Sequence, residues 1–317
     1  MQPQSPQDRG RALTRECLDA GFALAGVCAA LPSGHAEFFR RWLGENKHAD
    51  MAWLARDPEM RLDPRRLVPG ARAIVMVADL YTARGEGAGA EPTSPDLGKV
   101  ARYARGEDYH EVIKRRLHAL CDAWRLRWPD EQFKACVDTA PLMEREHAAR
   151  AGLGWVAKHT LLIHPRLGSY LLLGAVVTTL DALPPEEQPT ITDHCGACTR
   201  CIDACPTGAI TPYSVDASRC ISYLTIEKRS DLPPQFKDDL NGWLFGCDIC
   251  QEVCPHNSPR PTPSETAPRP EYAPRFVALN LDEVRRWTPE DRARALKGSS
   301  MKRATLEMLK RNAEALR

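Results

Sequence analysis

Eight of the chain's twelve cysteines lie between residues 195 and 254, at spacings that could bind iron and sulfur. Residues 195–206 read C-G-A-C-T-R-C-I-D-A-C-P, which is the C-x₂-C-x₂-C-x₃-C-P spacing of bacterial ferredoxins. In such a run three thiolates bind one cubic cluster, and the fourth, turned away at the Cys-Pro bend, binds the other. The spacing therefore predicts a pair of 4Fe–4S clusters and the single-electron transfers that such clusters carry out.

A second run, G-C-D-I-C-Q-E-V-C-P-H-N at 246–257, is one cysteine short, because Leu244 stands where the first thiol would fall. If the last cysteine of each run joins the cluster of the other run, one ligand is still missing. The one cysteine of this region without a role is Cys220, in D-A-S-R-C-I-S-Y. We therefore predict two four-cysteine sites: Cys195, Cys198, Cys201 and Cys254 for cluster 1, and Cys205, Cys220, Cys247 and Cys250 for cluster 2.

Zinc is the alternative, because zinc sites use the same C-x₂-C pairs. Three tandem cysteines and two Cys-Pro endings favour iron–sulfur clusters instead. The other four cysteines have apolar neighbours, and we expect them to be buried as small hydrophobic side chains: Cys17, Cys28, Cys121 and Cys136.

The segment before the cysteines alternates strands and helices, which indicates a layered α/β domain. Apolar runs typical of strands occupy residues 22–27, 73–80, 134–137 and 170–180. An apolar stripe at spacings of three and four predicts a helix over 112–128. A proline-rich stretch at 183–190 is typical of a linker, and a second break begins at Asn257.

One glycine motif in this segment, G-L-G-W-V-A at 152–157, matches a dinucleotide-binding fingerprint. A helical pattern precedes it, whereas the fingerprint requires a strand. We interpret Gly152 and Gly154 as a turn that ends a helix.

The net charge of +1 excludes a global attraction to nucleic acids or anionic membranes, so an anionic partner would need a local patch. No stretch approaches the 18 apolar residues of a membrane span. The start, M-Q-P-Q-S-P-Q-D-R-G, lacks the apolar region of a secretory signal. We expect a cytoplasmic protein, whose thiols stay reduced and free to bind metal.

Three long motifs, together with the cluster run, carry a family resemblance. They are R-L-D-P-R-R-L-V-P-G-A-R at 61–72, R-Y-A-R-G-E-D-Y-H at 102–110, and the polar segment 137–170 that begins V-D-T-A-P. The sequence resembles the epoxyqueuosine reductases over roughly residues 10–262, and more weakly over 298–304. These are cobalamin-dependent iron–sulfur enzymes that complete the queuosine base in tRNA.

The resemblance implies an α/β (α+β) architecture in three parts. Residues 1–185 would form a cobalamin-binding catalytic domain related to the flavin nitroreductase fold. Residues 186–262 would form a ferredoxin-type domain with two 4Fe–4S clusters, and 263–317 a short helical C-terminal segment. The implied partners are tRNAs decoding Asp, Asn, His and Tyr and an external one-electron donor such as ferredoxin or flavodoxin, and we expect a monomer.

The resemblance also assigns roles to single residues. Asp138 falls at the family's general acid, beside the cobalamin, although Asp138 or Thr139 could instead cap a helix beginning near Pro141. Arg61 and Lys158 would contact cobalamin, although surface charge is the usual role of such residues. The family has Asn where this chain has His159, for which a structural hydrogen bond is a simpler role than cobalt ligation.

Further residues are expected near the substrate. Ser222, with Tyr223, would lie between a cluster and the cobalamin, as in the family. A second group could line the mouth of the site, or Asp108 could cap the helix that follows it: Tyr103, Asp108, Tyr109 and His110.

Residues 285–317 form a basic tail, with ten Lys or Arg and four Asp or Glu, a net charge of +6 that leaves about −5 for the rest. Its spacing of Ala304, Met308 and Arg311 suggests a helix with one apolar and one basic side. Such a helix is usually a solvated surface element, but beside a tRNA-modifying site it could bind RNA phosphates.

Two other functions fit parts of the sequence. A reductive-dehalogenase-like enzyme would use the same cofactors on a small organic substrate, for which a basic tail has no use. A cobalamin-handling or electron-transfer protein would not need motifs such as V-D-T-A-P.

Overall fold

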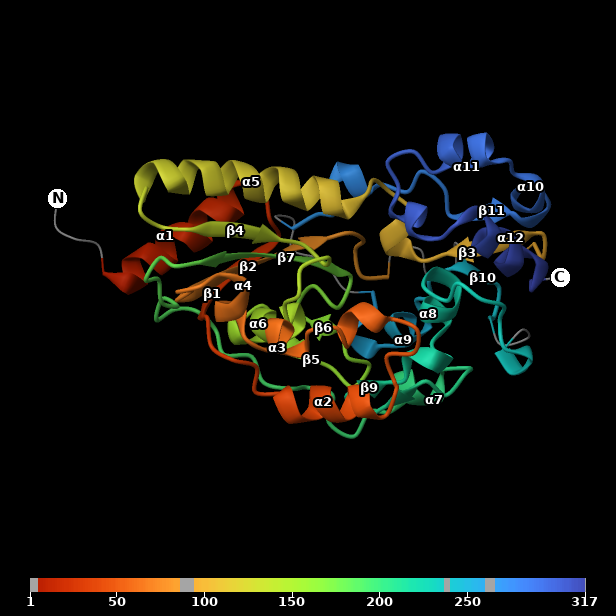
Figure 1. The fold of residues 1–317 in the computed structure, drawn as a ribbon, viewed down its shortest axis with the longest axis horizontal. Helices are drawn as coiled ribbons and strands as arrows, with labels where there is room; N and C mark the ends of the chain where they lie inside the picture. The colour runs from red at the N-terminus through yellow and green to blue at the C-terminus, as the bar shows by residue number, and fades with distance from the viewer. Residues whose placement is uncertain (1–4, 86–93, 237–239, 260–265, 317) are drawn as a thin grey trace.

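The main sheet has four strands in the order β1-β2-β7-β4, and every neighbouring pair is antiparallel (Figure 1). The computed structural model of the protein describes residues 5–85, 94–236, 240–259 and 266–316. The strands are β1 (Leu24–Ala29), β2 (Ala73–Leu80), β4 (Phe133–Cys136) and β7 (Leu171–Thr178). All four lie within predicted strand segments or start and end within two residues of them. The alternation of elements had suggested layered α/β packing, and the antiparallel pairing makes this unit α+β.

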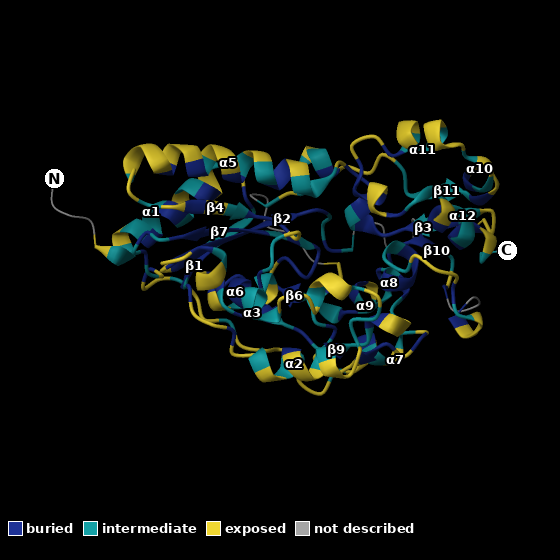
Figure 2. Ribbon diagram, in the orientation of Figure 1, coloured by how far each residue is buried: buried dark blue, intermediate teal, exposed yellow. Residues whose placement is uncertain are grey.

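Helices cover both faces of this sheet. Val75 and Val77 of β2 contact the face covered by α1 (Pro6–Asp19) and α5 (Tyr109–Arg127), whereas Ile74 and Met76 pack toward α6 (Glu144–Arg150). All eight residues of β2 are buried for this reason, and the strands form a dark layer between the helices in Figure 2. Helix α5 confirms the prediction for 112–128, and it begins three residues earlier because Asp108 caps it.

The four cysteines outside the cluster region are buried in this unit, as predicted. The turn at Gly152 is also confirmed. Gly152 adopts φ 73° directly after α6, and its amide donates to the carbonyl of Ala149. Only glycine adopts this conformation without strain.

A second sheet brings together residues from all three predicted parts of the chain. Strand β3 (Leu97–Val100) pairs in parallel with β10 (Trp243–Phe245) and antiparallel with β11 (Ala278–Asn280). A Cβ on Gly98 would lie 2.7 Å from side-chain atoms of both Leu244 and Leu281, so this close packing requires glycine. This sheet was not predicted from the sequence.

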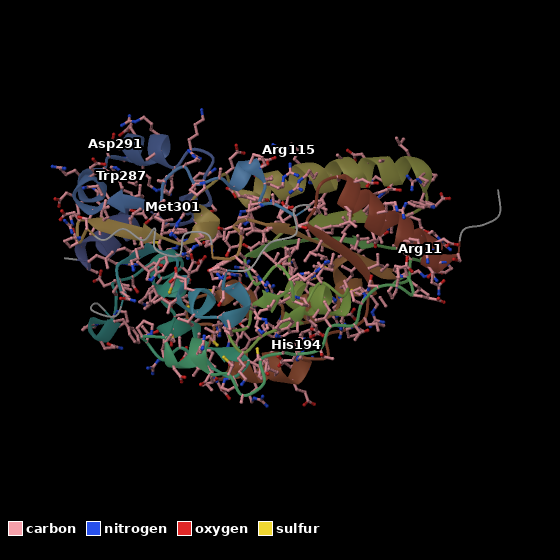
Figure 3. The ribbon with its side chains drawn as sticks, turned by 180° about the vertical axis from the view of Figure 1, so that it is seen from behind. Arg11, Arg115, His194, Trp287, Asp291 and Met301 are labelled. Atoms are coloured by element: carbon pink, nitrogen blue, oxygen red, sulfur yellow. The ribbon has the colours of Figure 1, made fainter. Side chains whose placement is uncertain are left out.

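The C-terminal helices pack on the second sheet. They are α10 (Leu281–Arg286), α11 (Pro289–Ala295) and α12 (Leu306–Glu314). Met301, labelled in Figure 3, is fully buried among Leu244, Phe245 and Leu309. In the same view Arg11 lies near one end of the long axis, and Trp287 and Asp291 lie near the other.

Short elements connect these layers. The remaining α-helices are α2 (Ala36–Gly44), α3 (Pro58–Leu62), α4 (Pro64–Leu67), α7 (Arg200–Asp203), α8 (Ile221–Ile226) and α9 (Ile249–Glu252). Two small hairpins are β5–β6 (Trp155–Val156, Leu162–Ile163) and β8–β9 (Ile210–Thr211, Ser214–Val215). Single 3₁₀ turns are η1 (Ala52–Leu54), η2 (Arg102–Ala104), η3 (Ala217–Arg219), η4 (Pro234–Phe236), η5 (Pro255–Asn257), η6 (Pro270–Tyr272) and η7 (Ser300–Arg303).

The predicted linker at 183–190 has no helix or strand, and it is packed on the main sheet. The Gln188 side chain donates to the Val27 carbonyl and accepts from the Val27 amide, at 2.8 and 2.9 Å, which occupies the outer edge of β1. Residues 260–265 of the second predicted break, and Met1–Gln4 at the start, lie outside the described residues. Among the described helices, none has the length and apolar character that crossing a bilayer would require.

Candidate active site and cluster-binding segments

Asp138 lies in a strained turn two residues beyond β4. Its φ is +47°, a left-handed conformation that non-glycine residues rarely adopt and that often marks a functional position. The Asp138 amide donates to Glu144 Oε1 at 2.8 Å, so the first residue of α6 holds the turn. The N-cap of α6 is Met143, which makes no side-chain cap, and the predicted capping role of Asp138 or Thr139 is therefore wrong.

The Asp138 carboxylate is the end of a hydrogen-bonded chain. Tyr109 Oη donates to Asp138 Oδ2 at 2.7 Å, and His110 Nε2 lies 3.2 Å from the same oxygen. On the other side of the ring, His110 Nδ1 lies 2.7 Å from Asp108 Oδ1. Asp108 also accepts from the His110 amide, so the capping and site roles expected for it coincide. The side chain of Asp138 is 59% exposed and that of His110 only 22%, which leaves the carboxylate accessible to a substrate.

Electrostatics place the mobile protons on the neighbours of Asp138. Desolvation opposes ionisation of Asp138, but hydrogen bonds from His110 and Tyr109 outweigh it and lower its pKa. Burial alone would lower the pKa of His110, yet its bonds to Asp108 and Asp138 raise that pKa to about 9. Burial, followed by the charge of Asp138, raises the pKa of Glu144 to about 8. At neutral pH the site thus holds an Asp138 carboxylate, a His110 imidazolium and a protonated Glu144.

Arg61 and Arg145 lie beside the hydrogen-bonded chain of Asp138 and His110. Arg61, at the end of α3, donates from Nη1 to the Leu142 carbonyl at 3.4 Å. Desolvation lowers the pKa of Arg61, while the nearby carboxylates of Glu144 and Asp138 oppose that shift. The structure therefore brings Arg61 and Asp138 together, as the resemblance implied.

Arg145 and Glu144 were not predicted from the sequence to belong to the site. Arg145 donates from Nη1 to the carbonyl and hydroxyl of Thr160, at 2.6 and 3.0 Å. Both lie in the polar segment after V-D-T-A-P, and the only sequence signal for them was the high proportion of charged residues in that segment. Tyr103, expected at the mouth, packs edge-on against Tyr109, with ring centroids 6.1 Å apart.

Lys158 is directed to the cluster-1 run. Its Nζ donates to the carbonyls of Gly196 and Cys198, at 2.6 and 3.1 Å. The next residue, His159, is buried, and its Nδ1 accepts from the Leu161 amide at 3.2 Å, which confirms the structural hydrogen bond expected for it. Burial lowers the pKa of His159 to about 4, so the ring is neutral.

The eight clustered cysteines fall into two groups of neighbours. Burial raises the pKa of the Cys254 thiol, and Cys195, Cys201 and Cys198 raise it further. Burial likewise raises the pKa of Cys247, with further contributions from Cys220 and Cys205. Burial is also the main cause of the raised pKa of Cys250, and Cys247 and Cys220 raise that pKa further, with a weaker effect of Cys201 from the other group. Among the described residues, no three His, Cys, Asp or Glu side chains lie close enough to hold one metal ion.

Ser222 and Tyr223 lie beside Cys220, at the start of α8. Burial raises the pKa of the Cys220 thiol, and bonds from the amides of Tyr223 and Ser222 oppose this rise. The side chain of Tyr223 turns away, since its hydroxyl donates to Asp50 Oδ2 at 2.6 Å. The structure thus places Ser222 beside Cys220, at the start of α8.

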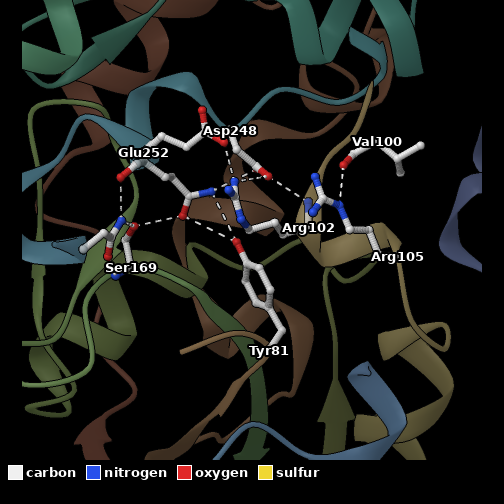
Figure 4. A network of polar contacts seen from close by, with 9 residues as sticks. Tyr81, Val100, Arg102, Arg105, Ser169, Asp248 and Glu252 are labelled. Carbon is white, nitrogen blue, oxygen red and sulfur yellow. Dashed lines mark hydrogen bonds and ion pairs between the residues drawn. The ribbon is translucent and has the colours of Figure 1, made fainter. Parts of the chain in front are cut away.

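A buried polar network fixes the second cysteine run to the main sheet (Figure 4). The Arg102 amide and guanidinium both donate to Asp248 Oδ2, at 2.7 and 3.2 Å, next to Cys247. Gln251 accepts from the Ser169 hydroxyl at 2.8 Å and donates to the Tyr81 hydroxyl at 3.2 Å. Because buried polar groups are costly unless paired, this network specifies one orientation of the cysteine run relative to the sheet.

The basic tail is docked on the body, and one of its predicted basic contacts is structural. Arg311 donates to the carbonyls of Leu224 and Lys228, both at 2.8 Å, and also to Ser230. The basic side predicted for α12 is therefore wrong at Arg311, whose guanidinium holds the helix to the end of α8. The tail reaches the site at Lys302, with Nζ 4.0 Å from Asp108 Oδ2.

Comparisons with known proteins give consistent matches. Residues 61–139 match the family model "Epoxyqueuosine reductase QueG, DUF1730", and residues 194–257 match the "4Fe-4S double cluster binding domain". The double-cluster match supports iron–sulfur clusters over zinc at the cysteine region.

Curated relatives match over nearly the whole chain. The epoxyqueuosine reductase of Leadbetterella byssophila is 40% identical over 308 residues, covering 96% of this chain and 97% of the relative. That of Escherichia coli K12 is 36% identical over 290 residues, covering 90% of this chain and 74% of the relative.

Solved structures of epoxyqueuosine reductases match the fold of this chain. Epoxyqueuosine reductase from Bacillus subtilis, solved with its catalytic aspartate loop swung out of the active site, has a TM-score of 0.81 at 29% identity. An epoxyqueuosine reductase solved with an epoxyqueuosine-modified tRNA-Tyr stem loop has a TM-score of 0.80, also at 29% identity. Both matches cover 96% of this chain and 80% of the solved one. The chain belongs to the epoxyqueuosine reductase family.

Proposed function

We propose that the chain reduces epoxyqueuosine to queuosine in the anticodon loop of tRNA. The observation that carries this proposal is the setting of Asp138, an exposed carboxylate in a left-handed turn, bonded to Tyr109 and His110. This arrangement presents a protonatable oxygen to solvent while a protonated imidazole lies behind it. The match to a relative solved with the modified tRNA stem loop supports RNA as the substrate.

The residues around Asp138 fit cobalamin, a large cofactor whose corrin ring carries amide side chains. Arg61 and Arg145 bring donors to the edge of the site, and Asp138 offers an exposed acceptor. His159 Nε2 is buried without a hydrogen-bond partner among the described residues, close enough to Arg145 to be affected by its charge. When bound, cobalamin would supply the reducing chemistry at the epoxide carbons.

Removal of the epoxide oxygen as water consumes two electrons and two protons. We assign delivery of the first proton to the His110–Asp138 pair: His110 would pass its Nε2 proton to the Asp138 carboxylate, which would protonate the oxygen as the C–O bond breaks. Asp108 would stabilise the imidazolium through Nδ1, and solvent would reprotonate His110 so that the same pair delivers the second proton. Tyr109 would fix the orientation of the carboxylate through its 2.7 Å bond.

We infer the ligand sets from the two groups of thiols: Cys195, Cys198, Cys201 and Cys254 for cluster 1, and Cys205, Cys220, Cys247 and Cys250 for cluster 2. Lys158 would hold the cluster-1 run against the catalytic segment. A direct contact of Lys158 or Ser222 with cobalamin stays a prediction, as do the nitroreductase-like origin of the first domain and the divisions at 185 and 262.

Electrons would arrive singly from a ferredoxin or flavodoxin. Substrates would be the tRNAs decoding Asp, Asn, His and Tyr. Action by a monomer in the cytoplasm, where mature tRNA is found, also belongs to this proposal.

The test is turnover by the reconstituted protein. Protein loaded with clusters and cobalamin is mixed with a strong reductant and an epoxyqueuosine-containing tRNA-Tyr stem loop, and the nucleosides are separated and weighed by mass spectrometry. We expect queuosine in an amount that exceeds the protein, and none without cobalamin. Unchanged epoxyqueuosine with fully loaded protein would refute the proposal.

A further inference from the structure

Trp53 presents a large apolar side chain to solvent at the base of the loop before α3. It belongs to η1 and is 43% exposed. The loop around it is firmly anchored. The Asp50 amide donates to Tyr223 Oη at 3.0 Å, and the Lys47 carbonyl accepts from the Ala217 amide at 2.8 Å. Tryptophan is among the residues enriched at the energetically important contacts of binding surfaces, and this one is held in place by an anchored loop.

Arg303 of the tail backs this indole. Its guanidinium carbon lies 5.0 Å from the Trp53 ring centroid, a cation–π arrangement. Nε and Nη2 of the same guanidinium donate to the two carboxylate oxygens of Glu227, at 2.8 and 2.7 Å. Glu227 therefore holds the Arg303 guanidinium in place, and the guanidinium in turn fixes the plane of the Trp53 ring.

The tail connects this stacked pair to the reacting group. Lys302, the residue before Arg303, is 53% exposed and its Nζ lies 4.0 Å from Asp108 Oδ2. Arg303 itself lies within electrostatic range of Asp138, whose charge contributes, after Glu227, to its raised pKa. A solvent-facing ammonium thus lies at the Asp108–His110–Asp138 chain, and the next residue along the tail holds a flat aromatic surface.

These features match the chemistry of an unpaired nucleotide. Proteins read single-stranded RNA by stacking splayed-out bases on aromatic rings, with cations at the adjoining phosphates. We propose that Trp53, held by Arg303, stacks on an unpaired base that flanks the nucleotide presented to Asp138, with Lys302 near its phosphate. The inference rests on the proposed function, since it takes the anticodon loop as substrate and specifies how the loop is held.

The experiment measures the affinity of fully loaded, unreduced protein for the epoxyqueuosine-containing stem loop. Trp53→Ala should raise Kd about 10-fold or more, the usual effect of losing one stacked base, whereas Trp53→Phe should stay within about threefold of the parent. Leu126→Ala is the matched control, because Leu126 is 88% exposed near the far end of α5. It should leave Kd unchanged.

Stem loops with one abasic position each identify the base. At the stacked position, the abasic change should weaken binding to the parent protein but not further weaken binding to Trp53→Ala. If the abasic change and Trp53→Ala weaken binding independently of each other at every loop position, the proposal is overturned. An unchanged Kd in Trp53→Ala would also overturn it. Loss of cobalamin affinity with normal RNA affinity would also overturn it, by assigning the ring to the cofactor. If the parent itself converts no epoxyqueuosine, the proposed function fails, whereas normal turnover with unchanged RNA binding in Trp53→Ala refutes only the stacking.

Discussion

At the scale of single residues, the structure changes how the catalytic proton is understood. Asp138 was expected to be a general acid. In the structure its pKa is lowered, and the proton resides on His110, 3.2 Å away. A carboxylate that is ionised at rest can still protonate an epoxide if its neighbour reloads it. The acid is therefore better described as the chain Asp108–His110–Asp138 than as one side chain.

Asp138→Asn should retain both cofactors and lose turnover by a factor on the order of 10² or more, the usual effect of a positioned proton donor. The amide can still bond to Tyr109, so the shape of the site is preserved. The checks are single-turnover rates together with iron and cobalt analysis. Near-normal rates in fully loaded Asp138→Asn would remove Asp138 from the mechanism.

The pH dependence follows from His110, whose surrounding charged and titratable groups are Asp108, Tyr109, Asp138, Glu144 and Lys302. Because its pKa is raised to about 9, turnover should decline as pH rises through 9. His110→Gln, which can still donate to Asp138 but does not titrate, should be slower and lack this decline. The pH profiles of both proteins test this.

The same shift predicts a stability difference. A histidine whose pKa is raised on folding stabilises the protein fully below its ordinary pKa of about 6.5, and this contribution is lost as pH rises through the folded value. The difference in unfolding free energy between the parent and His110→Gln should therefore be largest below pH 6.5 and small above 9. A difference independent of pH would show that the ring is not held as imidazolium.

At the scale of elements, short helices present the cysteines. Cys220 directly precedes α8, and the amides of Ser222 and Tyr223 bond its thiol. Helix N-termini stabilise negative charge, which suits a thiolate ligand. In the proposed cluster-2 set, Cys220 at this helix start would replace the ligand that the second run lacks at Leu244, whereas Leu244 itself is buried in the C-terminal core.

Cys220→Ser should remove one cluster and spare the other. Reconstituted parent protein should carry about eight irons and the variant about four. Iron analysis and the electron paramagnetic resonance spectrum of the reduced protein measure this. Loss of both clusters, or of neither, would contradict the proposed ligand sets, and Cys121→Ser, at a buried unligated cysteine, is the control.

The helices and strands also show which parts of the fold could be predicted from the sequence and which could not. Strand β2 was predicted at its observed bounds because seven of its eight residues are apolar, and all eight are buried. The proposed cysteine ligand sets followed from the spacing within each run, and Cys220 was added by elimination. The second sheet could not be predicted, because β3, β10 and β11 are only three or four residues long and come from distant segments. A count of charged residues also cannot show that the Arg311 guanidinium bonds to backbone carbonyls instead of facing solvent.

At the scale of the whole molecule, the basic tail contributes fewer free charges than its sequence suggests. Arg303 and Arg311 are held by Glu227 and by main-chain carbonyls, and Arg285 donates to the Ala313 carbonyl at 2.8 Å. The exposed cations of the described tail include Arg286, Arg294, Lys297 and Lys302. Lys302 is exposed and lies at the site, and Lys310 is half-buried on α12.

Lys302→Glu combined with Lys310→Glu should weaken binding of the tRNA stem loop and flatten its salt dependence. Each lost phosphate contact removes about one unit of slope in a plot of log affinity against log salt. Lys134→Glu, an exposed change of equal charge on β4, is the control. If the double variant keeps the parent's slope, neither Lys302 nor Lys310 contacts the RNA phosphates.

A ribosome synthesising this chain releases β3 long before the strand's partners exist, because Leu97 pairs with Asn280 and Lys99 with Trp243. At about 5–20 residues per second, roughly 10–40 s separate the synthesis of β3 from the synthesis of β11. During this interval the nascent chain exposes an unpaired strand, which makes it a substrate for chaperones. The contact of Lys302 with Asp108 forms later still, so a nascent chain acquires its complete site only after the tail has left the ribosome.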